Sequence, residues 1–97
     1  MSFPPTVILQ LPLSTPDRFE ALQAFVKRSL EDKVELIAVV GEGCGVIEDR
    51  IDSYIVMSGP DCFITTTSHP KETLEDVLDF ARVWHRDGRS EPEVVKL

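Results

Sequence analysis

The chain has 97 residues, and its 17 acidic and 10 basic side chains give a formal net charge of −7. A chain of this length makes one domain, which buries about 60–65% of the surface that its unfolded form exposes. The negative charge opposes attraction to phosphate backbones and anionic lipids, which argues against nucleic acid or a membrane as partner. No apolar run approaches the roughly 20 residues that cross a bilayer, and the first residues lack the pattern of a signal peptide, so we expect a cytoplasmic protein.

The first half of the chain alternates between strand and helix patterns. Residues 6–11 are β-branched and apolar and lie between prolines, which predicts a strand. Ser14 or Thr15 is then expected to cap a helix that has Pro16 at its first position. The apolar residues of this helix recur at spacings of three and four, which predicts one buried stripe: Phe19, Leu22, Phe25, Val26 and Leu30. Residues 34–40 are almost continuously apolar, as is typical of a central strand covered on both faces.

A glycine-rich segment, residues 41–45, separates this strand from a second predicted helix. The helical spacing of its apolar residues predicts that the helix runs from about Gly45 to Met57. Residues 54–57 are also good strand sequence, which a turn at 58–61 could send back as a hairpin. The helix is our preferred interpretation, and the hairpin is the alternative.

A short apolar strand and a third helix follow. Cys62, Phe63 and Ile64 predict the strand, and the helix is expected to begin near Pro70 and to stop at Gly88. The buried stripe of this helix is predicted to contain Leu74, Val77, Leu78, Ala81 and Trp84. Residues 93–97 predict a last strand.

The alternation of strands and helices with short connections predicts an α/β fold. We expect a small three-layer βαβαβαβ domain with a mostly parallel sheet, right-handed crossovers and helices on its faces. Nothing in the composition divides the chain, so residues 1–97 are expected to form a single domain.

Polar side chains collect where the third strand meets the third helix. The run from Thr65 to Pro70 contains three threonines and a histidine, at the kind of junction where open α/β sheets bind ligands. We therefore predict ligand-binding residues there and in the glycine segment: Thr65, Thr66, Thr67, His69, Gly43 and Cys44. In the alternative, structural interpretation His69 caps the helix and Glu72, as its third residue, reaches back to it.

The glycine segment does not match a known phosphate-binding pattern. A dinucleotide-binding loop needs glycine three positions after Gly43, where Val46 stands, and the lysine of a P-loop is missing. Acidic residues also crowd the start of the following helix. We therefore expect a tight turn here rather than a phosphate site.

Cys44 and His69 form a candidate catalytic pair. A thiol at a helix N-terminus ionises more easily than usual, and His69 could act as its base. The acidic neighbour Glu42 opposes ionisation, and a nucleophile elbow would need cysteine where Gly43 stands. A small buried structural thiol is the alternative. We expect Cys44 and Cys62 to be reduced, because they would lie near opposite ends of the sheet.

Metals and cofactors are not expected. No close-spaced pair of ligands, such as Cys-x-x-Cys or His-x-x-x-His, supports a metal site. The carboxylates of the second and third helices form acidic faces, for which solvation is the simplest interpretation. If these two faces were contiguous, they would make a docking surface for a basic partner.

The run Thr66-Thr67-Ser68-His69, followed by Glu72 and an apolar helix, resembles a motif in a small family of uncharacterised bacterial domains. In that family a strand ends in Thr-Thr-x-His and an acidic helix follows. The acidic residues at 48–52 are similar too, so the resemblance covers about the second half of the chain. It implies a bacterial, cytoplasmic setting and a common fold, with no established activity.

These observations favour a non-catalytic binding domain that uses the carboxyl edge of its sheet for a protein partner or a small ligand. A small enzyme that uses the Cys44/His69 pair is the first alternative. The second is a self-associating domain, a homo-oligomer that pairs through an exposed sheet edge or through the strand at residues 93–97.

Overall fold

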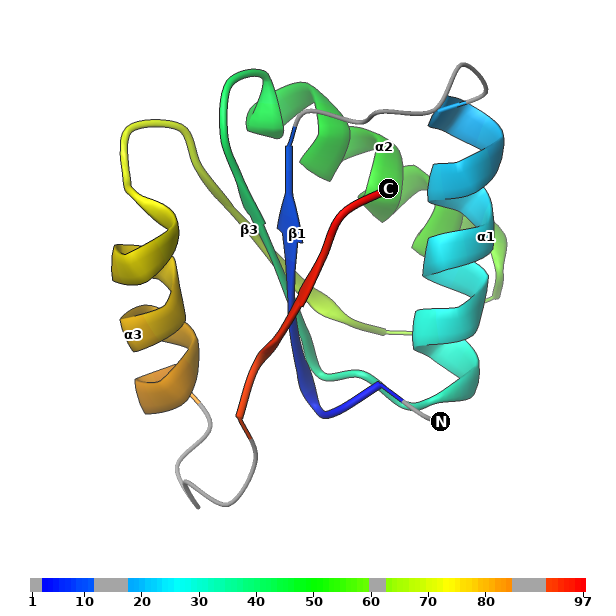
Figure 1. Cartoon of the computed structure of the whole chain (residues 1–97). Coiled ribbons are helices and arrows are strands. Elements are labelled where there is room, and N and C mark those ends of the chain that lie inside the picture. Colours follow the sequence, from blue (N-terminus) through cyan, green and yellow to red (C-terminus); the bar gives the residue numbers. More distant parts are fainter. Residues whose placement is uncertain (1–2, 12–17, 60–62, 85–90) are drawn as a thin grey trace.

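Strands and helices alternate along the chain as the sequence predicts (Figure 1). The structure is a computed structural model that describes residues 3–11, 18–59, 63–84 and 91–97. The strands are β1 (Thr6–Gln10), β2 (Leu36–Val40), β3 (Thr65–His69) and β4 (Glu93–Val95), and the helices are α1 (Arg18–Glu31), α2 (Cys44–Met57) and α3 (Leu74–Trp84). These strands are parallel and lie in the order β3-β2-β1-β4, so the α/β fold is confirmed.

β2 lies at the centre of the core, because helices cover both of its faces. Ile37 and Val39 pack in a cluster with residues of α1 and α2. Leu36, Ala38 and Val40 pack in a second cluster with α3, on the opposite face. Figure 1 shows the same arrangement, with α1 and α2 on one side of the sheet and α3 on the other. The nearly continuous apolar sequence therefore belongs to a strand that is buried on both faces, as expected.

Residues 54–57 form the last turn of α2, so the helix is confirmed and the hairpin is wrong. Ile51 and Ile55, four residues apart, both reach the core on one face of the helix, and this burial favours helix over strand. The Ser58 N–H then donates to the carbonyl of Ile55 at 3.1 Å. Gly59 follows with a φ of 133°, a backbone conformation that favours glycine.

The third strand and the third helix both begin later than the sequence predicts. β3 starts at Thr65, so the threonines lie within the strand rather than after it. His69 is still paired with β2, so the interpretation of His69 as a helix cap is wrong. Thr73 caps α3 instead, because its Oγ1 accepts the Asp76 N–H at 3.1 Å. The Asp76 carboxylate reaches back to the Thr73 N–H at 3.5 Å, which completes a reciprocal cap.

Phe19 departs from the buried stripe predicted for α1. Its side chain is 52% exposed, whereas Leu22, Phe25 and Val26 are buried. Phe19 lies in the first turn of α1, where Arg50 of α2 places its guanidinium 4.5 Å from the ring centroid. A cation–π contact, rather than burial, therefore holds this ring.

Three expectations concern residues outside the described ranges: the cap at Ser14 or Thr15, the position of Cys62 and the helix stop at Gly88. Over the described ranges, no helix combines the length and apolar character that crossing a membrane requires.

Exposed ion pairs connect α3 to the segment before β4. Arg82 donates to the carboxylate of Glu91 at 3.1 Å and to that of Asp79 at 3.2 Å. The hydrogen bond to Glu91 is the main reason why the pKa of Arg82 lies above its ordinary value. Because all three side chains are exposed, these pairs help to orient the segment more than they stabilise the fold.

Gly41, directly after β2, is expected to tolerate no side chain. Its φ is 119°, and a Cβ there would lie 3.0 Å from the Cβ of Leu11. We expect Gly41→Ala to lower the free energy of unfolding by roughly 2–4 kcal/mol in urea denaturation. Gly45 is the matched control, because it lies inside α2 with open space around it. Gly45→Ala should change stability by less than about 1 kcal/mol, and equal losses in both variants would contradict a steric and conformational cause at Gly41.

Candidate functional site

β2 and β3 form a topological switch point at the carboxyl edge of the sheet. The chain leaves β2 toward α2 on one face and leaves β3 toward α3 on the other (Figure 1). Val40 and His69 are paired neighbours at the ends of these strands. The glycine segment and the loop after His69 therefore start side by side, at the position where open α/β sheets bind ligands.

The pleat of β3 divides the predicted polar cluster between the two faces of the sheet. Thr65, Thr67 and His69 are paired with β2 residues that face α3. Thr66 is paired with Ile37, which faces α1 and α2. Because successive side chains of a strand point to opposite faces, the three threonines do not line a common pocket.

Thr66 connects β3 to α2. Its Oγ1 lies 2.6 Å from Oδ1 of Asp52 and 3.1 Å from Oε2 of Glu48. A hydroxyl carries one hydrogen, so it donates to one carboxylate at a time, and the shorter contact favours Asp52. The hydroxyl of Thr66 therefore helps to hold α2 against the edge strand β3.

His69 forms a hydrogen-bonded chain of three side chains on the opposite face. Its Nδ1 lies 2.8 Å from Oε1 of Glu72, and its Nε2 lies 2.8 Å from Oγ1 of Thr67. An ionised carboxylate only accepts, so Nδ1 carries the hydrogen that binds Glu72, and Nε2 of the neutral ring accepts the Thr67 hydroxyl. The ring is 7% exposed and packs on Phe80, with 5.0 Å between the ring centroids.

The order carboxylate, imidazole, hydroxyl is also the order found in enzymes that activate a hydroxyl nucleophile. Such chemistry needs hydrogen-bond donors for the oxyanion beside the nucleophile. The Thr65 N–H donates to the carbonyl of Glu35 in the segment before β2. Every second N–H of a strand points to the same side, so the Thr67 N–H also points toward β2. The Thr67 N–H is thus engaged in the sheet. The hydrogen bonds of His69 with Thr67 and Glu72 mainly connect the end of β3 to the loop before α3.

The structure does not bring Cys44 and His69 together. Cys44 is a free thiol, is fully buried and belongs to the core cluster that faces α1 and α2. His69 lies on the face of α3, so the sheet separates the two side chains. The reason is that α2 and α3 leave the switch point toward opposite faces. Gly43, with a φ of 82°, serves the turn into α2, where its carbonyl accepts the Ile47 N–H at 3.3 Å.

Metal ligands do not gather in the described part of the chain. Within it, no group of three or more histidine, cysteine, aspartate or glutamate side chains is arranged to hold a metal ion. The carboxylates of Glu48 and Asp52 share a contact with the hydroxyl of Thr66.

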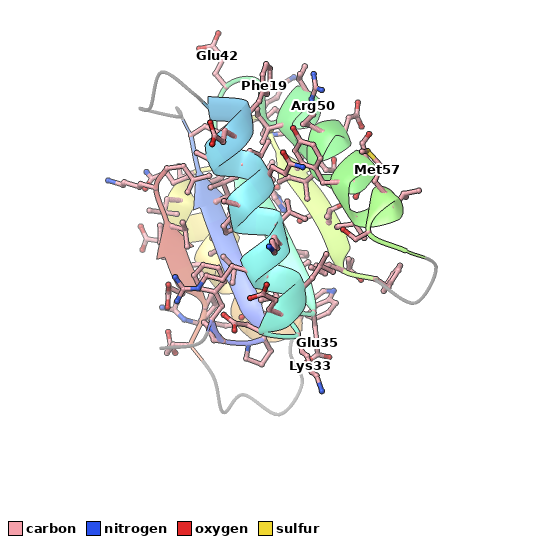
Figure 2. The ribbon with its side chains drawn as sticks, turned by 90° about the vertical axis from the view of Figure 1, so that its right-hand side faces the viewer. Phe19, Lys33, Glu35, Glu42, Arg50 and Met57 are labelled. Carbon is pink, nitrogen blue, oxygen red and sulfur yellow. The ribbon has the colours of Figure 1, made fainter. Side chains whose placement is uncertain are left out.

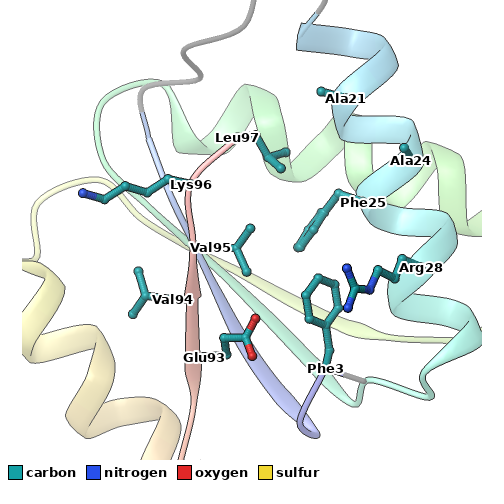
Figure 3. Close-up of a pocket in the computed structure, with 10 residues that line it drawn as sticks. All are labelled: Phe3, Ala21, Ala24, Phe25, Arg28, Glu93, Val94, Val95, Lys96 and Leu97. Carbon is teal, nitrogen blue, oxygen red and sulfur yellow. The ribbon is translucent and has the colours of Figure 1, made fainter. Parts of the chain in front are cut away.

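A groove that no sequence pattern predicted lies between α1 and β4 (Figure 3). It has a volume of about 470 Å³. Phe25 of α1 and Val95 of β4 give it an apolar floor, and Ala21 and Ala24 leave room beside the helix. Phe3 stands at its lower end, where the Arg28 guanidinium lies 4.4 Å from the ring centroid. No local signal marks these residues, because they come from three separate segments of the chain.

We expect His69 to stabilise the fold. His69→Ala removes a buried ring from Phe80 and leaves Thr67 and Glu72 without their shared partner. The free energy of unfolding should fall by roughly 2–3 kcal/mol in urea denaturation. Lys71→Ala, an exposed change two residues away, should cost less than about 0.5 kcal/mol. Unchanged stability of His69→Ala would instead favour a functional role for the ring.

We also expect the thiol of Cys44 to be unreactive in the folded protein, because the side chain is fully buried. The measurement is the reaction with Ellman's reagent in a Cys62→Ser variant, which leaves Cys44 as the remaining thiol. The reagent should label it only after denaturant is added. Fast labelling of the native protein would contradict the burial and revive the interpretation of Cys44 as a nucleophile.

Comparison with known proteins identifies the family but no activity. No curated protein and no solved structure gives a significant match to the chain. A family model described as "Domain of unknown function (DUF7684)" matches residues 4–95, which include every strand and helix of the described structure. The expectation of an uncharacterised family is therefore confirmed, and the chain belongs to the DUF7684 family of domains of unknown function.

Proposed function

We propose that this protein is a non-catalytic binding domain that takes up an extended segment of a partner protein in the groove between α1 and β4. The observation that carries the proposal is the position of this groove beside an open strand edge. β4 ends the sheet next to β1, and the described residues provide no strand on its other side. An open edge presents backbone N–H and C=O groups with which an added strand can pair.

The groove has the shape and chemistry for such a segment. Its volume of about 470 Å³ lies within the range of roughly 300–1,000 Å³ that is usual for binding pockets. Val95 of β4 and Leu97, two residues later, pack against the core cluster that faces α1, and both side chains point toward the groove (Figure 3). A bound strand would place every second side chain on the same face, where Phe25 and Phe3 offer apolar contact.

The wall formed by Phe3 is already held in position. The Phe3 N–H donates to the Asp32 carboxylate at 2.9 Å, and Asp32 also pairs with Arg28 at 3.5 Å. The ring of Phe3 further lies 5.7 Å from that of Phe25. Because these contacts exist without a partner, binding would cost little reorganisation of the groove.

The carboxyl edge supports binding less well than the sequence suggested. His69, Thr66 and Thr67 use their polar atoms within the domain. Cys44 is buried in the core cluster that faces α1 and α2. Four of the residues predicted to bind a ligand thus have partners or burial within the domain, which supports the α1–β4 groove as the better candidate.

The test is selection from a displayed library of random peptides, followed by affinity measurement with the selected peptides. We expect sequences with alternating apolar residues, whose binding weakens at least about tenfold in Ala21→Trp and Ala24→Trp, because indole fills the groove. Val83→Trp is the control, because Val83 is an exposed residue of α3 on the other side of the sheet. Hydrogen exchange should also show that the β4 amides become protected when a selected peptide binds.

Two outcomes would contradict this proposal. Selected peptides that bind all three tryptophan variants equally would place the binding surface elsewhere. A concentration-dependent doubling of the sedimentation mass that Ala21→Trp abolishes would make a second copy of the chain the occupant of the groove, in place of an unlike partner.

A further inference from the structure

A second groove lies on the other side of α1, in the outer seam between α1 and α2. It has a volume of about 340 Å³. Its lining residues come from both helices and are Gln23, Val26, Lys27, Tyr54, Met57 and Ser58. Figure 2 looks onto this side of the molecule, with α1 and α2 in front of the sheet. None of these residues lines the α1–β4 groove.

Two rows of side chains form the rims of the seam. On α1, Phe19, Gln23 and Lys27 follow one another at intervals of four residues. On α2, Arg50 and Tyr54 do the same. Residues four apart form ridges along a helix, so the seam is the space between two ridges. Arg50 closes its upper end by stacking on the ring of Phe19 at 4.5 Å (Figure 2).

Exposed apolar side chains flank the seam. Phe19 is 52% exposed, Val46 is 71% exposed and Met57 is 76% exposed. Val46 lies one turn before Arg50 on α2, and Met57 lies at the opposite end beside the groove. A flexible methionine next to exposed apolar groups is typical of surfaces that bind partner helices.

Lys27 is the charged residue that lines the groove and Arg50 lies at its upper end, so both charges are positive although the chain as a whole carries −7. In the described residues, Lys27 and Arg50 form no ion pair with a carboxylate. The carboxylates Glu48 and Asp52 of α2 are turned away from the seam toward Thr66 of β3. α2 therefore directs two of its three carboxylates to the sheet edge and its one cation, Arg50, to the seam.

We propose that the α1–α2 seam binds an amphipathic helix of a partner protein, with an apolar stripe flanked by carboxylates. The apolar stripe would lie between the two ridges and contact Tyr54 and Met57. Carboxylates beside the stripe would pair with Lys27 and Arg50, which charge complementarity favours over a basic helix. This surface and its occupant are independent of the extended segment proposed for the α1–β4 groove.

The experiment uses a displayed library of amphipathic helices whose apolar stripe is constant and whose flanking positions vary among Glu, Lys and Ser. We expect selection on the full chain to enrich Glu at these positions. Binding of a selected peptide, measured by fluorescence anisotropy, should weaken as salt is raised. It should also weaken about tenfold in the double variant Lys27→Glu and Arg50→Glu, because each change removes an ion pair and adds repulsion.

Matched variants distinguish binding at the seam from binding elsewhere on the domain. Lys71→Glu reverses one charge at an exposed position after β3 and should leave binding within twofold of the unchanged protein. Ala24→Trp, which fills the α1–β4 groove, should also leave it unchanged. Selection of Lys or no charge preference, equal weakening by Lys71→Glu, or loss of binding in Ala24→Trp would each overturn the proposal.

Discussion

Burial of β2 on both faces is the constraint on which the other elements depend. Its five residues have no face toward water, so helices must cover the sheet from both sides. Burial of each leucine, isoleucine or valine side chain of β2 contributes about 1.5–3 kcal/mol. Parallel strands also need crossovers, and right-handed crossovers from β1 to β2 and from β2 to β3 place α1 and α2 on one face. The return from β3 to β4 runs in the opposite direction across the sheet, so the same handedness places α3 on the other face.

The edge strand β3 connects these layers through polar side chains. Its pleat directs Thr66 to α2, where carboxylates accept its hydroxyl. The same pleat directs His69 to the side of α3, where Glu72 in the following loop holds the ring. An edge strand has only one neighbouring strand and is covered less completely than β2, so side chains there can be polar if they find partners. Thr66 and His69, which the sequence suggested as ligand-binding residues, thus form hydrogen bonds that attach the edge strand to the neighbouring elements.

α1 separates the two grooves that our proposals concern. The side that carries Ala21 and Ala24 faces β4, and the side that carries Gln23 and Lys27 faces α2. Between them, Leu22 and Phe25 are buried and anchor the helix on the sheet. A helix that is anchored along one stripe and flanked by open space on both sides can present two surfaces without changing its own position. The grooves differ in chemistry, since one adjoins an open strand edge and the other is a seam between helices.

The sequence by itself determined the order of elements, the α/β class and the central position of β2, because these follow from local spacings of apolar residues. It also placed polar residues where two strands end, but only the strand order shows that the glycine segment and the loop after His69 start side by side. It did not determine which face each residue of β3 occupies, because that depends on where the strand begins, and a shift of one residue exchanges the faces. The separation of Cys44 from His69 likewise depended on the opposite directions of α2 and α3. Only the tertiary structure decided where the grooves lie, because they join segments such as Phe3, Phe25 and Val95 that the strand order brings together.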